Sequence, residues 1–435
     1  MIASAQLRIA RLAATPAVHR AFHWLHLHQP QLRRWHLEIL RIPAPPFGEQ
    51  ARAAWCLERF HELGLANPHL DAAGNALAEL PQSFSGEDCH PERRAQPAVE
   101  GPAVLCPLIL LSAHLDTVFP AGTDTEPREL ETRILAPGAC DNAAGLSALL
   151  GLAAAFRHAA LAPAVPILFA ANVGEEGEGD LRGMRHLFTQ SPYAPRIAAA
   201  MALEGGGSSA VVTRAIASRR YRLTVTGPGG HSWTDAGTPN PILILARALL
   251  AFESLDLESP YATSLDLAST GPASAPRSAL RTILNVGQIA GGTSINSIPE
   301  SASALLDLRS TEPSQLEAAE ILLRRTLAES IASAALSIET IGNRPGGALP
   351  DDSPLLTTLR AVDRHLNLRT EPGVGSTDAN IPLSLGVPAI AIGAGGLGGG
   401  IHTLQEWYDP TNRNAALRRI LLTLLDSAHL AADPD

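Results

Sequence analysis

The sequence predicts an α/β fold with a mostly parallel sheet. A smaller α+β domain is inserted into the chain of this larger domain. First, short apolar runs alternate with segments of helical periodicity, as in parallel sheets whose two faces are covered by helices. Second, the order in which predicted strands and helices follow one another changes near residue 217. Third, 46% hydrophobic and 17% charged residues in a chain of 435 are typical of a globular protein with a large core. We therefore expect two domains, one inserted into the other.

The larger domain is expected to span residues 1–215 and 347–435. Its strands are predicted from four apolar runs, and its clearest helix from an alanine-rich segment of helical spacing. A segment rich in turn residues and charge is predicted to be a surface loop. The predicted strands are 108–116, 165–173, 197–207 and 387–396, the helix is 142–159, and the loop is 82–101.

The inserted domain is expected to span residues 216–346. Its elements follow the order βαββαβ, which is typical of a small two-layer α+β domain. They are predicted as strand 221–227, helix 241–255, strands 283–292 and 301–310, helix 314–334 and strand 336–342.

The composition also limits the classes of function. A formal charge of −10 at pH 7 disfavours nucleic-acid binding, because proteins that bind phosphate backbones concentrate Lys and Arg. No run reaches the roughly 18 apolar residues that a membrane span needs, and the N-terminal segment lacks the apolar core of a signal peptide. The four cysteines show no CxxC spacing, so we expect neither a structural zinc site nor a disulfide framework. These features predict a cytoplasmic protein whose partners are small molecules rather than nucleic acid or membrane.

Polar residues stand where several predicted strands end. In an open α/β sheet the carboxyl ends of the strands line a common crevice, where ligands bind. Imidazoles and carboxylates that converge there have the composition of a transition-metal site, most often zinc. The residues concerned are His114, Asp116, Asp141, Glu175, Glu176, Glu204 and His402.

Each of these signals has an ordinary explanation when it is taken alone. A pair such as Glu175 and Glu176 is more often a solvated turn, and Asp141 with its neighbour before a helix more often forms an N-cap. The strand interiors carry no such groups while the element ends do, and this joint distribution favours a site. A cluster of histidines at positions 23, 26, 28 and 36 is interpreted instead as the solvated face of a helix.

Seven segments resemble a known family. They are "SAHLDTVFP", "APGACDNAAG", "GEEGEGDLRG", "GPGGHS", "GGTSINSIPE", "LDLRS" and the closing "STDANIPLSLGVPAIAIGAGGLGGGIHTLQEW". From about residue 37 to the C-terminus the chain resembles the dinuclear zinc exopeptidases and amidohydrolases grouped around carboxypeptidase G, aminoacylase, succinyl-diaminopimelate desuccinylase and peptidase T. The resemblance implies a zinc-peptidase catalytic domain with an inserted lid and dimerisation domain. It also implies two zinc ions per subunit, with Co²⁺ or Mn²⁺ as alternatives.

The resemblance further implies a role for each residue of the site. The ligands would be His114 and Glu204 for the first ion, Glu176 and His402 for the second, and Asp141 for both. Asp116 would orient His114 through its other ring nitrogen. Glu175 would be the general base that takes a proton from the attacking water. A cis peptide bond between Asp141 and Asn142 is expected on the same grounds.

The inserted domain would supply three more residues. In dimeric relatives the histidine that corresponds to His231 enters the active site of the partner subunit and stabilises the oxyanion. Asn296 and Arg309 would grip a carboxylate of the substrate, a task that suits the planar guanidinium. Each residue also has an ordinary structural explanation. His231 could be a capped histidine in a loop, Asn296 an asparagine in a turn, and Arg309 an arginine at a strand end.

The leading hypothesis is therefore metal-dependent hydrolysis of an amide bond in a small peptide or N-acyl amino acid with a free carboxylate, by a homodimer. A deacylase or desuccinylase is the alternative within enzymes, and a non-catalytic binding protein is a distant one. Two positions depart from the pattern of the family. Many relatives have a bulkier residue at the position of Asn142, and some have Asp at that of Glu204, so the resemblance does not identify the substrate. The segment "GAGGLG" at 393–398 matches a dinucleotide fingerprint, but no convincing helix follows it, so a nucleotide site is not expected.

Overall fold

The structure is a computed structural model, and it describes residues 2–81, 105–252, 255, 282–331 and 336–433. The loop predicted at 82–101 lies outside these residues. The chain divides into two compact units, each of which is described by itself. Unit 1 comprises Met1–Thr213, Ala348–Gly373 and Thr377–Asp435, and unit 2 comprises Arg214–Gly347 and Val374–Ser376.

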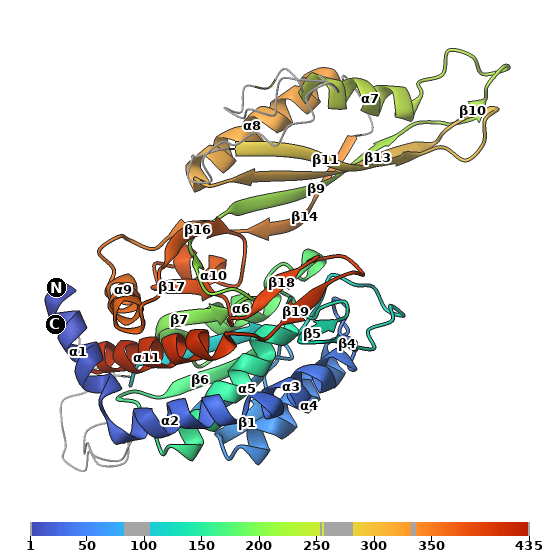
Figure 1. Ribbon diagram of the computed structural model, residues 1–435. Helices are drawn as coiled ribbons and strands as arrows, with labels where there is room; N and C mark the ends of the chain where they lie inside the picture. Colours follow the sequence, from blue (N-terminus) through green and yellow to red (C-terminus); the bar gives the residue numbers. More distant parts are fainter. Residues whose placement is uncertain (1, 82–104, 253–254, 256–281, 332–335, 434–435) are drawn as a thin grey trace, which may run out of the picture. The chain divides into compact units, whose positions relative to one another are not determined.

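The core of unit 1 is a mixed sheet with four parallel strands at its centre (Figure 1). The parallel strands lie in the order β6-β3-β7-β17, and antiparallel strands extend the sheet on both sides. The four strands predicted from apolar runs are these four. The sheet contains β1 (Ala66–Leu70), β2 (Ala76–Leu80), β6 (Ile167–Asn172), β3 (Leu108–His114), β7 (Ile197–Leu203), β17 (Ala389–Ile392), β8 (Ala210–Ala215), β15 (Gly347–Ala348) and β16 (Glu371–Gly375).

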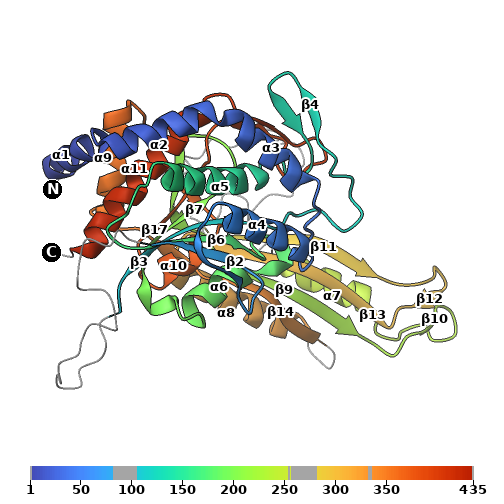
Figure 2. The same ribbon diagram turned by 90° about the horizontal axis from the view of Figure 1, so that it is seen from below.

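Helices cover the sheet because its strands are apolar on both faces. Every residue of β3 and β6 is buried, as expected for strands with no solvated face. Figure 2 shows α5 and α11 on one side of this sheet and α6 and α10 on the other. The helices of unit 1 are α1 (Ile2–Ala13), α2 (Pro16–Leu27), α3 (Gln29–Leu40), α4 (Gln50–Glu62), α5 (Ala143–His158), α6 (Arg182–Thr189), α9 (Pro354–Leu366), α10 (Asn380–Ser384) and α11 (Arg413–Ala432), with short 3₁₀ turns η2 (Gly177–Gly179) and η3 (Ala194–Arg196).

Helix α5 confirms the prediction for 142–159 and explains why that segment is apolar all round. It packs against β3, β6 and β7 on one side and against α2 and α3 on the other, so almost all of its residues are buried. Gly151 allows the close approach of α3, since a Cβ atom there would lie 2.8 Å from Cδ2 of Leu32. The side chain of Asn142 caps the helix by accepting a hydrogen bond from the N–H of Gly145 at 3.1 Å.

A small antiparallel sheet connects two segments that are distant in the sequence. Its order is β18 (Leu397–Gly399), β19 (Trp407–Asp409), β5 (Arg133–Leu135) and β4 (Arg128–Leu130). It places the segment around His402 beside the segment that leads to Asp141. Strand β18 occupies the position where a dinucleotide fingerprint requires a helix, which agrees with the rejection of a nucleotide site.

Unit 2 has the predicted βαββαβ order. Its sheet is antiparallel in the order β11-β13-β9-β14, and α7 and α8 pack on one face, as Figure 1 shows. Strand β13 alternates strictly, with Ala302, Ala304, Leu306 and Leu308 buried towards the helices. The elements are β9 (Ala217–Thr226), α7 (Pro241–Ala251), β11 (Thr282–Gly291), β13 (Ser301–Ser310), α8 (Pro313–Ser330) and β14 (Leu336–Arg344).

One further pair of strands in unit 2 was not predicted. Strands β10 (Gly230–His231) and β12 (Ser297–Ile298) pair in antiparallel fashion, with His231 opposite Ser297. Two-residue strands are too short to show an alternating pattern in the sequence. This pair brings the predicted residues His231 and Asn296 to neighbouring positions.

The interpretation of the N-terminal histidines needs one correction. His23 and His26 are exposed on α2, as expected, but His36 is fully buried on α3 and stacks on the ring of Tyr408, with 5.0 Å between ring centroids. Burial and the charge of Arg413 lower the pKa of His36 to about 3, so this ring is neutral. The cluster is split because the chain turns between α2 and α3 at His28. Among the helices of the described chain, none combines the length and apolar character that a bilayer crossing requires.

Candidate metal centre

The candidate site forms at the carboxyl ends of the parallel strands. Because β6, β3, β7 and β17 run in the same direction, the residues that follow them meet at one edge of the sheet. His114 is the last residue of β3, Glu204 follows β7 directly, and Glu176 follows β6 after a short loop. The turn after β18 carries His402.

Asp141 lies between the two histidines. Its Oδ1 atom is 3.0 Å from Nε2 of His114, and its Oδ2 atom is 3.1 Å from Nε2 of His402. Nε2 of His114 is also 3.4 Å from Oε1 of Glu204, whereas Nε2 of His402 is 3.1 Å from Oε1 of Glu176. The two oxygens of one carboxylate therefore belong to two groups of side chains. Each group contains one imidazole and one further carboxylate.

The chemistry and the spacing of both groups fit metal ions. Two ligand atoms about 2.0–2.1 Å from a tetrahedral ion lie roughly 3.3 Å apart. The separations observed here, 3.0–3.4 Å, are close to that value. Ligand atoms of His114, Asp141 and Glu176 also lie within 4.8 Å of one another. Oε2 of Glu204 is buried and lacks a hydrogen-bond partner within the described part of the chain, so a cation would satisfy it.

The electrostatics of the site favour positive charge among its carboxylates. Hydrogen bonds to Asp141 and Glu176 raise the pKa of His402 to about 10. Burial opposes the charged form of His114, yet the carboxylates of Glu204 and Asp141 raise its pKa well above the ordinary value. Burial raises the pKa of Glu204 to about 7. The buried carboxylates thus stabilise cationic partners, a role that metal ions would also fill.

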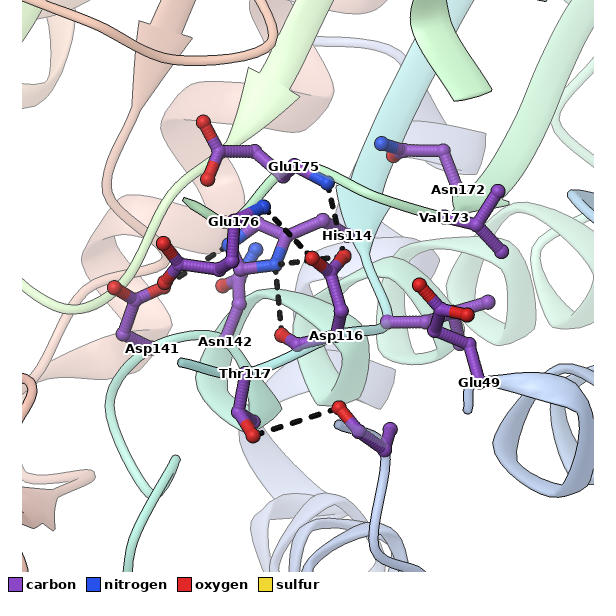
Figure 3. Close-up of polar contacts among 12 residues, drawn as sticks. Glu49, His114, Asp116, Thr117, Asp141, Asn142, Asn172, Val173, Glu175 and Glu176 are labelled. Carbon is purple, nitrogen blue, oxygen red and sulfur yellow. Dashed lines mark hydrogen bonds and ion pairs between the residues drawn. The ribbon is translucent and has the colours of Figure 1, made fainter. Parts of the chain in front are cut away.

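Asp116 lies beneath the loop that carries the two glutamates, as Figure 3 shows. Its Oδ1 and Oδ2 atoms accept hydrogen bonds from the backbone N–H groups of Glu175 at 3.0 Å and Glu176 at 2.7 Å. Nδ1 of His114 lies 3.0 Å from the backbone oxygen of Asp116 and 3.8 Å from its Oδ1 atom, so the second ring nitrogen of His114 faces Asp116. That Asp116 orients this ring stays a prediction.

The adjacent glutamates extend in different directions. In Figure 3 the carboxylate of Glu176 lies beside that of Asp141, while the carboxylate of Glu175 points elsewhere from the same loop. Both residues are buried, with 5% and 7% of their surface exposed. The loop thus presents the carboxylate of Glu176 to the Asp141 group and directs that of Glu175 elsewhere.

Two buried residues with contacts at the site were not identified as site residues from the sequence. The side chain of Asn142 donates to the backbone oxygen of Leu203 at 2.8 Å and accepts from the N–H of Gly205 at 3.1 Å, so it holds both neighbours of Glu204. Glu406 is fully buried and accepts hydrogen bonds from the amides of the segment that leads to Asp141. A charged residue directly before the two aromatic residues of the short strand β19 was the available signal for Glu406. The expected cis peptide bond between Asp141 and Asn142 is present.

The three site residues predicted in the inserted domain belong to unit 2. Nδ1 of His231 accepts hydrogen bonds from the backbone N–H groups of Trp233 at 3.2 Å and Thr234 at 3.3 Å, so in the neutral ring Nε2 carries the proton. Asn296 is exposed, and its Oδ1 atom accepts from the hydroxyl of Ser294 at 2.6 Å. Arg309 lies on β13 and donates through Nε to Asp307 at 2.7 Å. The structure brings His231 and Asn296 together at the two-stranded β10-β12 sheet, whereas Arg309 lies near the end of β13 in the separate four-stranded sheet.

A pocket of about 530 Å³ in unit 1 is lined by residues of the two segments that carry Asp141 and His402. Pro137 precedes Asp141 in one segment, and Leu404 follows His402 in the other. Its polar lining comes from Thr123, Asp124, Glu126 and Arg128, and none of the candidate metal ligands lines it.

Comparison with known proteins supports this description. The sequence model of peptidase family M20/M25/M40 matches residues 110–426. A search of the curated proteins finds no significant match to the chain.

Solved structures share the fold at low sequence identity. A tripeptidase from Staphylococcus aureus has a TM-score of 0.69 at 19% identity, with 92% of this chain and 98% of that chain covered. The dipeptidase Dug1p of Saccharomyces cerevisiae has a TM-score of 0.71 at 14% identity, with coverages of 96% and 99%. The YxeP protein of Bacillus subtilis, described as a dinuclear metal binding peptidase, has a TM-score of 0.63 at 13% identity, with coverages of 92% and 98%.

Proposed function

Because the chain belongs to peptidase family M20/M25/M40, which makes it a metal-dependent hydrolase, we propose that it is a dinuclear zinc enzyme. It would cleave an amide bond in a small peptide or N-acyl amino acid that carries a free carboxylate. One observation carries the proposal: the two oxygens of Asp141 face two different histidines, each of which has its own further carboxylate. This is the arrangement that a carboxylate shared by two ions requires.

The proposed division of ligands follows these contacts. His114 and Glu204 would hold one ion, His402 and Glu176 the other, and Asp141 both. When bound, such ions lower the pKa of water and polarise the scissile carbonyl. Imidazole and carboxylate ligands suit zinc, and they also suit Co²⁺ or Mn²⁺.

Glu175 would act as the general base. Its backbone is held by Asp116, and its carboxylate is separate from the Asp141 group. It would take a proton from the attacking water and pass it to the leaving nitrogen of the amide. The bond between water oxygen and carbonyl carbon forms as this proton moves, and the carbon–nitrogen bond then breaks.

Recognition of the substrate carboxylate would come from unit 2. Arg309 has five N–H donors, and the bond from Nε to Asp307 fixes the plane of its guanidinium. Its terminal nitrogens suit a bidentate pair with a carboxylate. Asn296 would add an amide donor. Two of the similar structures are a tripeptidase and a dipeptidase, which supports a peptide substrate over an N-acyl amino acid.

A matched set of substrates tests the proposed reaction. The zinc-loaded protein is expected to hydrolyse some dipeptides or tripeptides faster than N-acyl amino acids. It is also expected to hydrolyse the free acid of a peptide faster than its C-terminal amide, because the amide cannot form the bidentate pair with Arg309. Product release followed by mass spectrometry gives the rates. Preference for N-acyl amino acids would identify the deacylase alternative, and binding without turnover of any compound would identify the non-catalytic one.

We also propose a homodimer that forms through unit 2. Among the residues that the structure describes, β11 lies at the edge of its sheet, and unpaired strand edges with apolar side chains favour pairing with another chain. Val286 and Ile289 on β11 are exposed, as are Leu243 on α7 and Ile321 on α8. Trp233, beside His231, is 84% exposed, which is unusual for so large an apolar side chain. In such a dimer the Nε2–H group of His231 would serve the active site of the partner subunit as an oxyanion donor.

Subunit mixing tests the shared active site. Glu175→Gln and His231→Ala chains are each expected to be nearly inactive, since loss of an oxyanion donor costs about 10²–10³ in kcat. A mixture that exchanges subunits should regain activity, because each heterodimer then contains one site with neither defect. The matched control is a mixture of Glu175→Gln with His114→Ala. Both of these residues lie in unit 1, so this mixture should stay inactive. A lack of recovery after verified exchange would count against a shared active site, and a monomer in sedimentation at working concentration would count against the dimer itself.

A cytoplasmic location is proposed from the state of the thiols. Cys56 and Cys140 are buried and free, which suits a reducing compartment. Cell fractionation followed by immunoblotting tests this location, and recovery of the protein outside the cytoplasmic fraction would contradict it.

A further inference from the structure

One buried side chain holds the segment that ends at Asp141. Glu406 is fully buried, and its carboxylate accepts three hydrogen bonds from backbone amides. Oε1 accepts from the N–H groups of Cys140 at 2.7 Å and Asp141 at 2.8 Å, and Oε2 accepts from that of Gly138 at 3.0 Å. Three hydrogen bonds to one buried side chain restrict the conformation of this segment.

The remaining amides of the segment complete the same arrangement. The N–H of Ala136 donates to the backbone oxygen of Glu406 at 3.1 Å, and that of Ala139 donates to the oxygen of Ala136 at 3.1 Å. Pro137 has no N–H. Every backbone donor from residue 136 to residue 141 is therefore directed either to Glu406 or to the segment itself. The path of the chain into Asp141 thus depends on this single residue.

Glu406 also belongs to the turn that contains His402. Its own N–H donates to the oxygen of Thr403 at 3.1 Å, and the next residue, Trp407, pairs with Leu135 across β19 and β5. The short stretch from His402 to Glu406 therefore carries one histidine of the site and also binds the segment that ends at Asp141. This coupling can set the separation of 3.1 Å between Oδ2 of Asp141 and Nε2 of His402.

We propose that Glu406 is a positioning residue for the metal centre. It holds residues 136–141 so that the two oxygens of Asp141 face His114 and His402 at the same time. The inference rests on the proposed function, because it concerns the geometry of the ligand that both ions would share. Loss of Glu406 should therefore weaken the binding of both ions, whereas the loss of a ligand such as Glu176 affects mainly one.

The test is the zinc affinity of a Glu406→Gln variant. Glutamine keeps the shape of the side chain but replaces one acceptor oxygen with an N–H donor, which then faces an amide donor. Competition with a chromophoric chelator gives the two zinc dissociation constants of the folded, metal-stripped protein. Both are expected to rise by about 10–100-fold, the usual effect of removing a residue that orients a metal ligand. With zinc in excess, kcat should remain reduced, because Asp141 is displaced, while KM changes little.

Asp426→Asn is the matched control. Asp426 is also a buried carboxylate, 2% exposed, and its oxygens accept from Arg8 and Thr358 at a different place in unit 1. This substitution is expected to lower the thermal midpoint of the metal-free protein but to leave both zinc affinities unchanged. A purely structural role for Glu406 would give the same pattern in Glu406→Gln.

The outcomes separate this inference from the proposed function. Wild-type protein that binds no zinc would refute both. Wild-type protein that binds two ions, together with a folded Glu406→Gln variant of unchanged affinities, would refute only the positioning role. If Glu406→Gln does not fold, Glu406→Asp keeps the charge on a shorter side chain and should show affinities between those expected for the glutamine variant and those of wild type. Wild-type affinities in Glu406→Asp, or failure of both variants to fold, would overturn the proposal.

Discussion

Replacing Glu175 with glutamine is expected to lower kcat by about 10²–10⁴-fold, the usual contribution of a general base. Glutamine has nearly the same shape but cannot take the proton of the attacking water. The backbone N–H of residue 175 should still donate to Asp116, so the loop should keep its conformation. Because Glu175 lies apart from the Asp141 group, the zinc content should stay near two ions per chain. Steady-state kinetics and metal analysis of the same preparation test both statements.

Glu178→Gln is the matched control for this substitution. Glu178 lies on the same loop but is exposed, so its loss should leave kcat and the zinc content unchanged. His114→Ala should behave in the opposite way and lose metal as well as activity. A fully active Glu175→Gln enzyme would show that another residue is the base.

Removing the metal is expected to abolish activity completely, since both the activation of water and the polarisation of the carbonyl depend on it. Within the described part of the chain the buried Oε2 atom of Glu204 lacks a hydrogen-bond partner, which a bound cation would replace. Added zinc should restore activity, and Co²⁺ or Mn²⁺ should restore it to different extents. Activity measured after exhaustive dialysis against a chelator, and again after addition of each ion, tests this.

The thermal midpoint provides a second measurement of the same effect. Ligands that bind only the folded state stabilise it, so zinc should raise the midpoint of the metal-stripped protein in a concentration-dependent way. Mg²⁺ is the control ion, because it prefers an octahedral shell of oxygen ligands and should stabilise less. Undiminished turnover by protein shown to contain no metal would refute the proposed mechanism.

Much of the fold could be predicted because periodicity and burial are local properties. The runs that became β3, β6, β7 and β17 are mostly apolar and almost entirely buried, since both faces of a central parallel sheet are covered. The positions that the sequence singled out at strand ends also meet in space, because parallel strands bring their carboxyl ends to one edge. Their identity as metal ligands came from the family resemblance, and it remains a proposal.

By itself, the sequence determined the order of the elements, the family and the residue types available for the chemistry. The tertiary structure alone decided which polar group meets which. The carboxylate of Asp116 accepts hydrogen bonds from two amides, His36 is buried against Tyr408, and Glu406 holds a segment more than 260 residues away in the chain. The physical reason is that a buried polar group must find a partner wherever the packing places one, and packing between distant segments leaves no periodic signal in the sequence.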